Sequence, residues 1–212
     1  MAGTNPWLKS PEVETEGEDD ATPQLAVAPA PTIPPWRPQA VGVSPPSDSQ
    51  AFSRRMVDAS LADVTVWWVG AHGGAGESTL EQLLEGSRAT DHAWPCGELG
   101  TGLTPAVLLV ARTHAHGLRA AQLRAMEWAS GSVPVALHGL VLVADAPGKL
   151  PKPLKDFSQI VSGAVPRVWH LPWVEAWRVG APVSGDTTPK AIIKVLDELR
   201  ALHPIPPAVS LP

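Results

Sequence analysis

The sequence predicts an α/β fold, a three-layer sandwich with a mostly parallel β-sheet at its centre. Continuous apolar runs, typical of strands that are covered on both faces, alternate with segments whose apolar residues recur at helical spacing. Strands that are separated by helices favour parallel pairing with right-handed crossovers. Proline-rich segments at both ends confine this fold to the middle of the chain.

Four apolar runs are the predicted strands. The first three are continuous rather than alternating, as expected of strands buried on both faces. The fourth contains Pro166, which predicts a late start or an edge position because proline cannot donate to a ladder. In chain order the runs are residues 64–69, 106–111, 140–143 and 165–171.

Helices are predicted after each of these runs. The first spans about residues 76–85, the second 116–130, and a shorter one 154–161. The last helix is the clearest, because Thr188 is a candidate N-cap and Pro189 suits the first helical position.

The ends of the chain are predicted to be disordered. Residues 1–54 form a Pro/Ala-rich acidic arm: the first 50 residues hold ten prolines, and residues 12–20 are an acidic run. Such a segment buries too little apolar surface to offset its ordering entropy. Residues 204–212, with four prolines, form a second disordered tail. The α/β domain is therefore assigned to residues 55–203, which is enough for one core.

Composition excludes several classes of function. The net charge is −5 and the lysines and arginines are scattered, so the sequence gives no direct signal of nucleic-acid binding. Cys96 is the single cysteine, which excludes an intramolecular disulfide and favours a reducing compartment. The start lacks the basic and apolar regions of a signal peptide. No run approaches the ~20 apolar residues of a membrane span. We expect a cytoplasmic protein without a transmembrane segment.

A glycine-rich stretch after the first strand is the most informative motif. A strand that runs into a glycine turn and then a helix collects backbone N–H groups at the carboxyl edge of a parallel sheet, a geometry that binds phosphate. We therefore predict a phosphate-binding loop formed by His72, Gly73, Gly74, Ala75, Gly76, Glu77, Ser78 and Thr79.

The loop resembles that of the ParA/MinD-type P-loop NTPases, which reads Lys-Gly-Gly-x-Gly-Lys followed by two Ser or Thr residues. Three later segments, "AVLLVARTHAHGLRAAQ", "GLVLVADAP" and "VPRVWHLPWVEAWRVGAPV", resemble the same family in pattern, so the resemblance covers about residues 62–203. It implies a P-loop NTPase-like fold, with ATP and Mg²⁺ as candidate cofactors and the Ser78 hydroxyl on the metal. The chain is also similar to an uncharacterised bacterial group that shares "GAHGGAGEST" and an N-terminal "NPW".

Both family lysines are replaced, by His72 and Glu77. A carboxylate in the place of the phosphate-binding lysine adds repulsion of about 1–4 kcal/mol per close charge pair. Phosphoryl transfer depends on positioning and charge neutralisation, so weak or absent ATPase activity is expected. Glu77 has three candidate arrangements: a pair with Arg112, a pair with Arg119, or a place at the helix start where it substitutes for phosphate. In the last case, Glu77→Lys should raise nucleotide affinity.

A second departure concerns the Walker B strand, which in the family follows the loop helix and ends in aspartate. Residues 86–105 show no strand pattern and are too short for the family's elements, so this strand is expected to be missing. Asp145 closes an apolar run and precedes Ala146-Pro147. By pattern it is a candidate magnesium ligand, and by chain order it belongs to the base-side loop; both interpretations stay open.

Two other features are candidate sites. Trp7 and Leu8 lie in the polar arm, where an isolated aromatic residue is a candidate anchor for a protein partner. His114 and His116 are two residues apart, but no third ligand accompanies them, which favours loop residues over a metal site.

These inferences predict a degenerate ParA/MinD-like P-loop protein that serves as an accessory or adaptor in DNA segregation, conjugative transfer or secretion. It would have weak or no ATPase activity, with a homodimer as a candidate assembly. One alternative is an active ATPase in which Arg112, or His72 of the partner subunit, replaces the lysine. A second alternative is a nucleotide-independent module that binds a protein through its N-terminal arm.

Overall fold

A computed structural model of the chain describes residues 42–97, 99 and 104–203. The five longer helices and two 3-10 turns of this part are η1 (Asp48–Gln50), η2 (Ala59–Leu61), α1 (Glu77–Glu81), α2 (Ala115–Ala129), α3 (Lys152–Ser162), α4 (Glu175–Arg178) and α5 (Lys190–Leu202). Its strands are β1 (Ser53–Met56), β2 (Val66–Gly70), β3 (Ser87–Ala89), β4 (Ala93–Cys96), β5 (Ala106–Arg112), β6 (Ala136–Val143) and β7 (Val168–Leu171).

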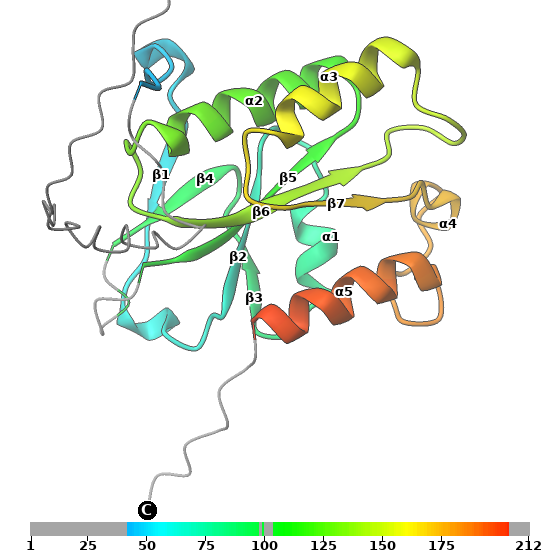
Figure 1. The fold of residues 1–212 in the computed structure, drawn as a ribbon. Coiled ribbons are helices and arrows are strands. Elements are labelled where there is room, and N and C mark those ends of the chain that lie inside the picture. Colours follow the sequence, from blue (N-terminus) through cyan, green and yellow to red (C-terminus); the bar gives the residue numbers. More distant parts are fainter. Residues whose placement is uncertain (1–41, 98, 100–103, 204–212) are drawn as a thin grey trace, which may run out of the picture. The chain divides into compact units, whose positions relative to one another are not determined.

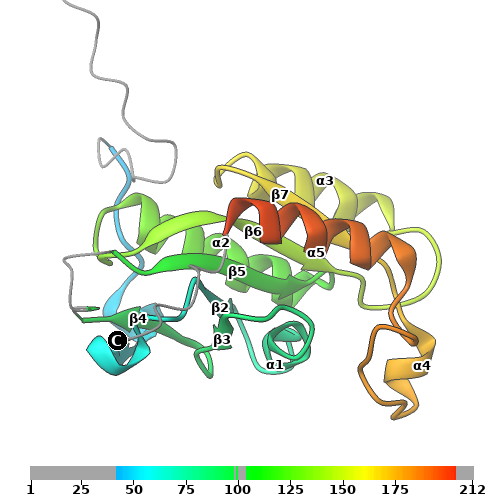
Figure 2. The ribbon, with the colours of Figure 1, turned by 90° about the horizontal axis from the view of Figure 1, so that it is seen from below.

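The strands form two parallel sheets. The larger sheet has the order β3-β2-β5-β6-β7, and β1 pairs with β4 in a two-stranded sheet. Every ladder among the described residues is parallel. This confirms the α/β class and the parallel sheet. Helices α2 and α3 lie over one face of the larger sheet, and α1 and α5 lie over the other (Figures 1 and 2).

Two apolar cores account for the continuous hydrophobic runs. Successive side chains of a strand point to opposite faces, so Trp67 joins the core on the α2 side and Trp68 joins the core on the α5 side. All five residues of β2 are buried for this reason. The α5 helix covers its face with Ile192, Leu196 and Leu199, three buried residues at helical spacing.

Three local predictions were wrong. Residues 86–105 contain β3 and β4, which were missed because the strands are only three and four residues long and β4 includes Pro95. Thr188 does not cap the last helix: its hydroxyl donates to the Ser184 carbonyl, and α5 starts after Pro189. The helix after the glycine loop ends at Glu81, earlier than expected.

Residues 47–56, most of which the composition assigns to the arm, pack on α2. They contact Arg124 and Glu127, two buried α2 residues that form an ion pair with each other. The guanidinium of Arg124 donates to the Gln50 carbonyl and lies 4.3 Å from the centre of the Phe52 ring. Glu127 accepts from the Phe52 N–H and lies 3.5 Å from Arg124. The packed chain therefore begins before residue 55, because polar contacts hold a segment that has few apolar residues.

Two histidines meet under the C-terminal end of α5, and we expect them to make the fold sensitive to acid. The rings of His138 and His203 lie 4.7 Å apart. Burial and the neighbouring His138 lower the pKa of His203 from 6.5 to about 4, and burial also lowers the pKa of His138. An unfolded chain thus binds more protons below pH 6.5, and this contribution to stability is lost as the pH falls through about 4.

When the pH falls from 7.5 to 4, the native chain is expected to lose free energy of unfolding. Its loss should exceed that of His203→Leu by about 3 kcal/mol. Urea unfolding at the two pH values measures this difference. His170→Leu, which changes an exposed histidine, is the matched control. Equal losses of stability in acid for the native chain and His203→Leu would contradict this assignment.

Within the described part of the chain, no helix is long and apolar enough to span a bilayer.

Candidate functional site

The predicted phosphate loop joins β2 to α1 at the edge where the strands of the larger sheet end. Gly74 and Gly76 have φ angles of +76° and +110°, in the left-handed region that favours glycine. The turn is closed by the Ala75 N–H, which donates to the His72 carbonyl at 3.2 Å. Five other backbone N–H groups donate to no described residue, namely those of Gly73, Gly74, Gly76, Glu77 and Ser78.

The Glu77 side chain turns back toward the end of β2. One carboxylate oxygen accepts from the Gly70 N–H, and the other accepts from the His92 N–H at 3.2 Å. The His92 Nδ1 lies 2.9 Å from this second oxygen, in close contact but without an aligned hydrogen bond. The Glu77 side chain is only 4% exposed.

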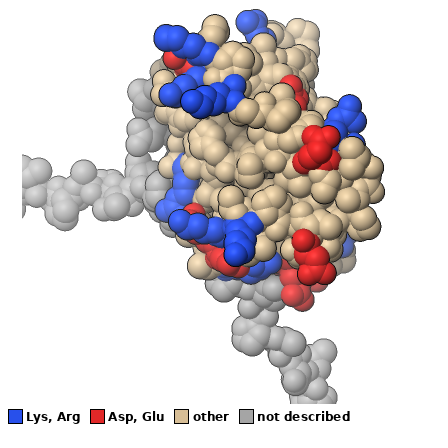
Figure 3. Space-filling view, turned by 90° about the vertical axis from the view of Figure 1, so that its right-hand side faces the viewer, with Lys and Arg blue, Asp and Glu red and all other residues tan. Residues whose placement is uncertain are grey.

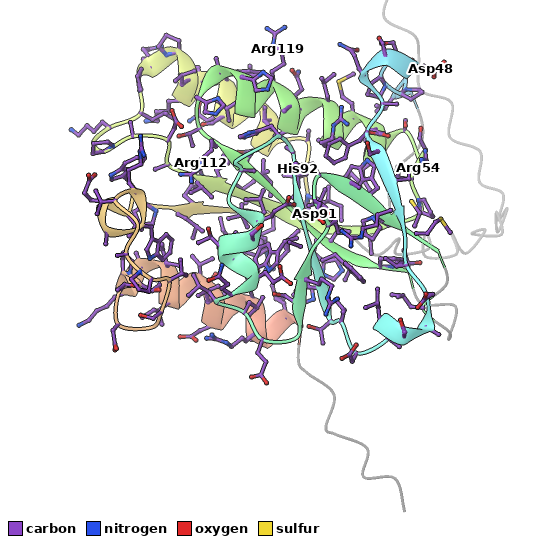
Figure 4. The ribbon with its side chains drawn as sticks, turned by 180° about the vertical axis from the view of Figure 1, so that it is seen from behind. Asp48, Arg54, Asp91, His92, Arg112 and Arg119 are labelled. Atoms are coloured by element: carbon purple, nitrogen blue, oxygen red, sulfur yellow. The ribbon has the colours of Figure 1, made fainter. Side chains whose placement is uncertain are left out.

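Glu77 lies in the first turn of α1, as one of the three predicted arrangements requires, and the two predicted arginine pairs are not formed. The ring that contacts its carboxylate is that of His92, and neither Arg112 nor Arg119 pairs with it. Arg119 points outward from α2, away from His92 (Figure 4). The carboxylate accepts from Gly70 and His92 rather than from the free N–H groups of the loop, so it does not take the place of a phosphate.

The charge of Glu77 depends on these neighbours. Burial raises the pKa of Glu77, and the Gly70 N–H and His92 oppose that rise. Gly70 has to be glycine, because a Cβ there would lie 2.7 Å from the His92 Nδ1 and 2.9 Å from the Glu77 carboxylate. Asp91 and His92, in the turn after β3, have φ angles of +54° and +57°, which are uncommon for residues other than glycine.

His72 is a neutral link between the loop and the end of β5. Its Nδ1 lies 2.9 Å from the Gly73 carbonyl, and its Nε2 accepts from the Arg112 N–H at 3.1 Å. These partners fix the tautomer with the proton on Nδ1. Burial lowers the pKa of His72, and the nearby histidines lower it further. His72 therefore does not supply a positive charge to the loop.

Arg112 is the cation at the loop. Its Nε lies 3.3 Å from the Gly74 carbonyl, and its Nη1 donates to the Ala144 carbonyl at 3.0 Å. Burial lowers the pKa of Arg112 and the nearby Asp145 opposes this, so the guanidinium stays charged. Of the two cations proposed to replace the lysine, Arg112 lies beside the loop.

Two adjoining cavities surround Arg112. The loop hollow, of about 350 Å³, is lined by residues 74–79, Asp91, His92 and Arg112. The tryptophan cavity, of about 280 Å³, shares Gly76, Thr79 and Arg112 with it and is closed by Leu80, Val143, Leu171, Pro172, Trp173, Val174, Trp177 and Arg178. Figure 3 faces this end of the domain, where tan surface lies between groups of charged side chains of both signs.

Asp145 lies apart from the loop hollow. It follows β6 and lines a third cavity, of about 540 Å³, together with Thr113, His114 and His170. Its backbone N–H donates to the Thr113 hydroxyl at 3.1 Å. The structure thus places Asp145 near Arg112 but with the later strands, as its position in the chain suggests.

The remaining candidates give no metal centre. The rings of His72, His114 and His116 lie 5.0–6.1 Å from one another. The His114 Nδ1 accepts from the Gly117 N–H and caps α2. In the part of the chain that the structure describes, no three His, Cys, Asp or Glu side chains are placed to hold a metal ion. Trp7 and Leu8 lie outside the described residues.

His92 and Asp91 are the site residues that sequence reasoning missed. They follow a strand of three residues, and nothing in their local pattern indicates that they face a loop 15 residues earlier. The one available signal was the departure at Glu77, because a buried carboxylate requires a hydrogen-bonding partner. Figure 4 shows Asp91 and His92 together, on the same side of the domain as Arg112.

The fold and the site define an α/β protein with a glycine-rich loop at the carboxyl edge of a parallel sheet. The chain belongs to a family of unknown function, DUF6668, whose model matches residues 64–196, more than half of the chain. The matched segment includes the loop, His92 and Arg112. No curated protein and no solved structure matches the chain.

Proposed function

We propose that the protein is a P-loop NTPase-like module that binds the phosphate groups of a nucleotide in the loop hollow and hydrolyses them weakly or not at all. The observation that carries this proposal is the meeting of four backbone N–H groups, those of Gly74, Gly76, Glu77 and Ser78, which donate to no described residue, with the Arg112 guanidinium at one hollow. Consecutive free N–H groups form a concave anion site, and a guanidinium adds a charged, bidentate donor.

The tryptophan cavity extends this anion site into a place for a base. Trp173 and Trp177 are half-buried, and both lie in the segment that follows β7. Their indole N–H groups already donate to Glu175 and Thr187, which leaves the ring faces for packing. A cavity with aromatic walls at one end and convergent polar groups at the other is typical of small-ligand sites.

The same geometry favours binding over hydrolysis. Arg112 is the one Lys or Arg residue that lines the loop hollow in the described part of the chain. Two carboxylates, of Glu77 and Asp91, line the same hollow, and Asp91 is engaged by Arg55. Phosphoryl transfer needs more positive charge than one arginine supplies.

A protein of this kind would act in its nucleotide-bound form rather than by hydrolysing the nucleotide. That suits an accessory or adaptor in DNA segregation, conjugative transfer or secretion, with a homodimer as a candidate assembly. The N-terminal arm, with Trp7 and Leu8, would supply the contact with a protein partner.

Arg112→Ala is expected to weaken nucleotide binding 10- to 100-fold, because a hydrogen bond to a charged group is worth about 1.5–3 kcal/mol. Calorimetric titration of the full chain with ATP, ADP and GTP, with and without Mg²⁺, measures this effect. The matched control is Arg119→Ala, which removes an exposed arginine on α2. Absence of binding by the native chain would refute the proposed function, and equal affinities would remove Arg112 from the site.

An active ATPase is the second candidate, and Asp91 is the observation that favours it. Asp91 follows β3, which pairs with the loop strand β2, and it lines the loop hollow. This is where an aspartate after a neighbouring strand would meet Mg²⁺ bound to Ser78. Phosphate release by the native chain that is abolished in Ser78→Ala would establish this alternative.

A further inference from the structure

We propose that His92, held by Glu77, is the second cation of the phosphate site, and that binding of the ligand takes up a proton at His92. This inference rests on the proposed function, and it specifies how the hollow recognises its ligand. The ligand class is a phosphate ester with at least two negative charges, one facing Arg112 and one facing His92.

The His92 ring has one inner and one outer edge. Its Nδ1 is buried against the Glu77 carboxylate, whereas 39% of the side chain is exposed. The exposed part therefore carries Nε2, and His92 lines the loop hollow. A Cβ on Gly73 would lie 3.9 Å from this Nε2, which places the nitrogen beside Gly73 of the loop.

The position of His92 is determined by more than packing. Two consecutive residues other than glycine, Asp91 and His92, have left-handed φ angles, and such strain persists only where the surroundings fix it. The Glu77 carboxylate does so by accepting from the His92 N–H and contacting its Nδ1. Gly70 supplies the required space, since any side chain there would displace both groups.

The charges around His92 determine the direction of the effect. Glu77 faces it from α1, Arg112 from the end of β5 and His72 from the loop, while Asp91 in the same turn is paired with Arg55 of β1. With a neutral His92, Glu77 leaves a net negative charge beside the loop. With a protonated His92 the pair is neutral, and the charge of Arg112 remains for the ligand. A phosphate ligand therefore favours the protonated state, and by linkage its binding takes up a proton.

Glu77 thus has a function at the position where the ParA/MinD-type loop has a lysine. A lysine would bring its own charge to the phosphate, whereas Glu77 recruits an imidazolium from the turn after β3. His72 does not compete for this role, because its Nε2 is occupied by the Arg112 N–H. We therefore regard Glu77 as a positioning residue and His92 as the ligand-binding residue.

Calorimetric titration of the full chain with ADP, at pH 7.5 in two buffers of different ionisation enthalpy, tests this inference. The native chain should take up as much as one proton more than His92→Gln. Between pH 8 and pH 6.5, its affinity should rise more steeply than that of His92→Gln, by up to tenfold per pH unit. Comparison of the two proteins cancels the titration of the ligand itself. His116→Gln, which changes an exposed histidine on α2, should behave as the native chain does.

Glu77→Gln provides a second test, because the amide removes the ion pair but retains one oxygen that can accept. It should reduce proton uptake even though His92 is still present, which a purely structural role of Glu77 would not do. Equal proton uptake by the native chain and His92→Gln would overturn this inference and leave the proposed function intact. If His92→Gln fails to fold, unchanged proton uptake in Glu77→Gln overturns the inference in the same way. Absence of ADP binding by the native chain overturns both proposals.

Discussion

Glu77→Lys is expected to lower the free energy of unfolding by about 3 kcal/mol rather than to create a nucleotide site. The carboxylate is buried, it accepts from the Gly70 and His92 N–H groups, and it contacts the His92 ring. An ammonium group in its place can only donate, so both N–H groups would lose their acceptor and a positive charge would face an imidazole. Leaving a buried donor without a partner costs about 1–3 kcal/mol on its own.

Urea unfolding of the full chain measures this loss, and Glu85→Lys is the matched control. It makes the same change of charge at an exposed position four residues beyond the end of α1. Surface substitutions typically change the free energy of unfolding by no more than about 0.5 kcal/mol. If Glu77→Lys stays within this range and binds ATP more tightly, the contacts of Glu77 do not stabilise the fold.

Gly117→Ala is expected to destabilise the chain by about 2 kcal/mol, against the usual effect of this substitution. In the interior of a helix, alanine is favoured over glycine by about 1 kcal/mol. Here a Cβ would collide with the Arg112 carbonyl and would lie 2.8 Å from the His72 Nε2. The first turn of α2 would have to move, and the hydrogen bond from the Arg112 N–H to His72 would be lost.

The effect of Gly117→Ala should also appear in binding, because His72 and Arg112 both contact the loop. Urea unfolding and ADP titration of the same protein measure the two effects. Gly163→Ala is the control, since it follows α3 with a φ of −70° and its Cβ would lie 3.5 Å from the Ile160 carbonyl, an ordinary contact. A stabilised Gly117→Ala would mean that the turn between β5 and α2 is free to adjust.

The larger elements of the fold could be predicted because burial on two faces leaves a strong signal in composition. β2 and β5 are almost entirely apolar, and α5 repeats its apolar residues at helical spacing. β3 and β4 could not be predicted in this way. Strand β3 has three residues of which one is buried, and β4 contains a proline that suits only a sheet with one neighbouring strand.

The position of the candidate site could be predicted, but not its internal contacts. Glycines that precede Ser78 and Thr79 after a buried strand indicate the loop, and Arg112 was one of two candidate cations. Periodicity carries no information on which way a side chain turns. Glu77 turns toward Gly70 because His92 is there to receive it, and His92 is there because of the left-handed turn after β3. Such contacts arise from tertiary structure, which a sequence pattern does not encode.

The exclusively parallel ladders of the described residues also constrain how the chain can fold. Two parallel neighbouring strands cannot be joined by a hairpin. They can pair only after the crossover segment between them and the second strand have been synthesised. Until residues 106–112 have been synthesised, β2 can pair only with the three residues of β3. During that interval the adjacent Trp67 and Trp68 lack the strand that later shields them. The nascent chain therefore exposes this apolar strand until β5 emerges, and the larger sheet acquires most of its ladder pairs only after β5 has closed on β2.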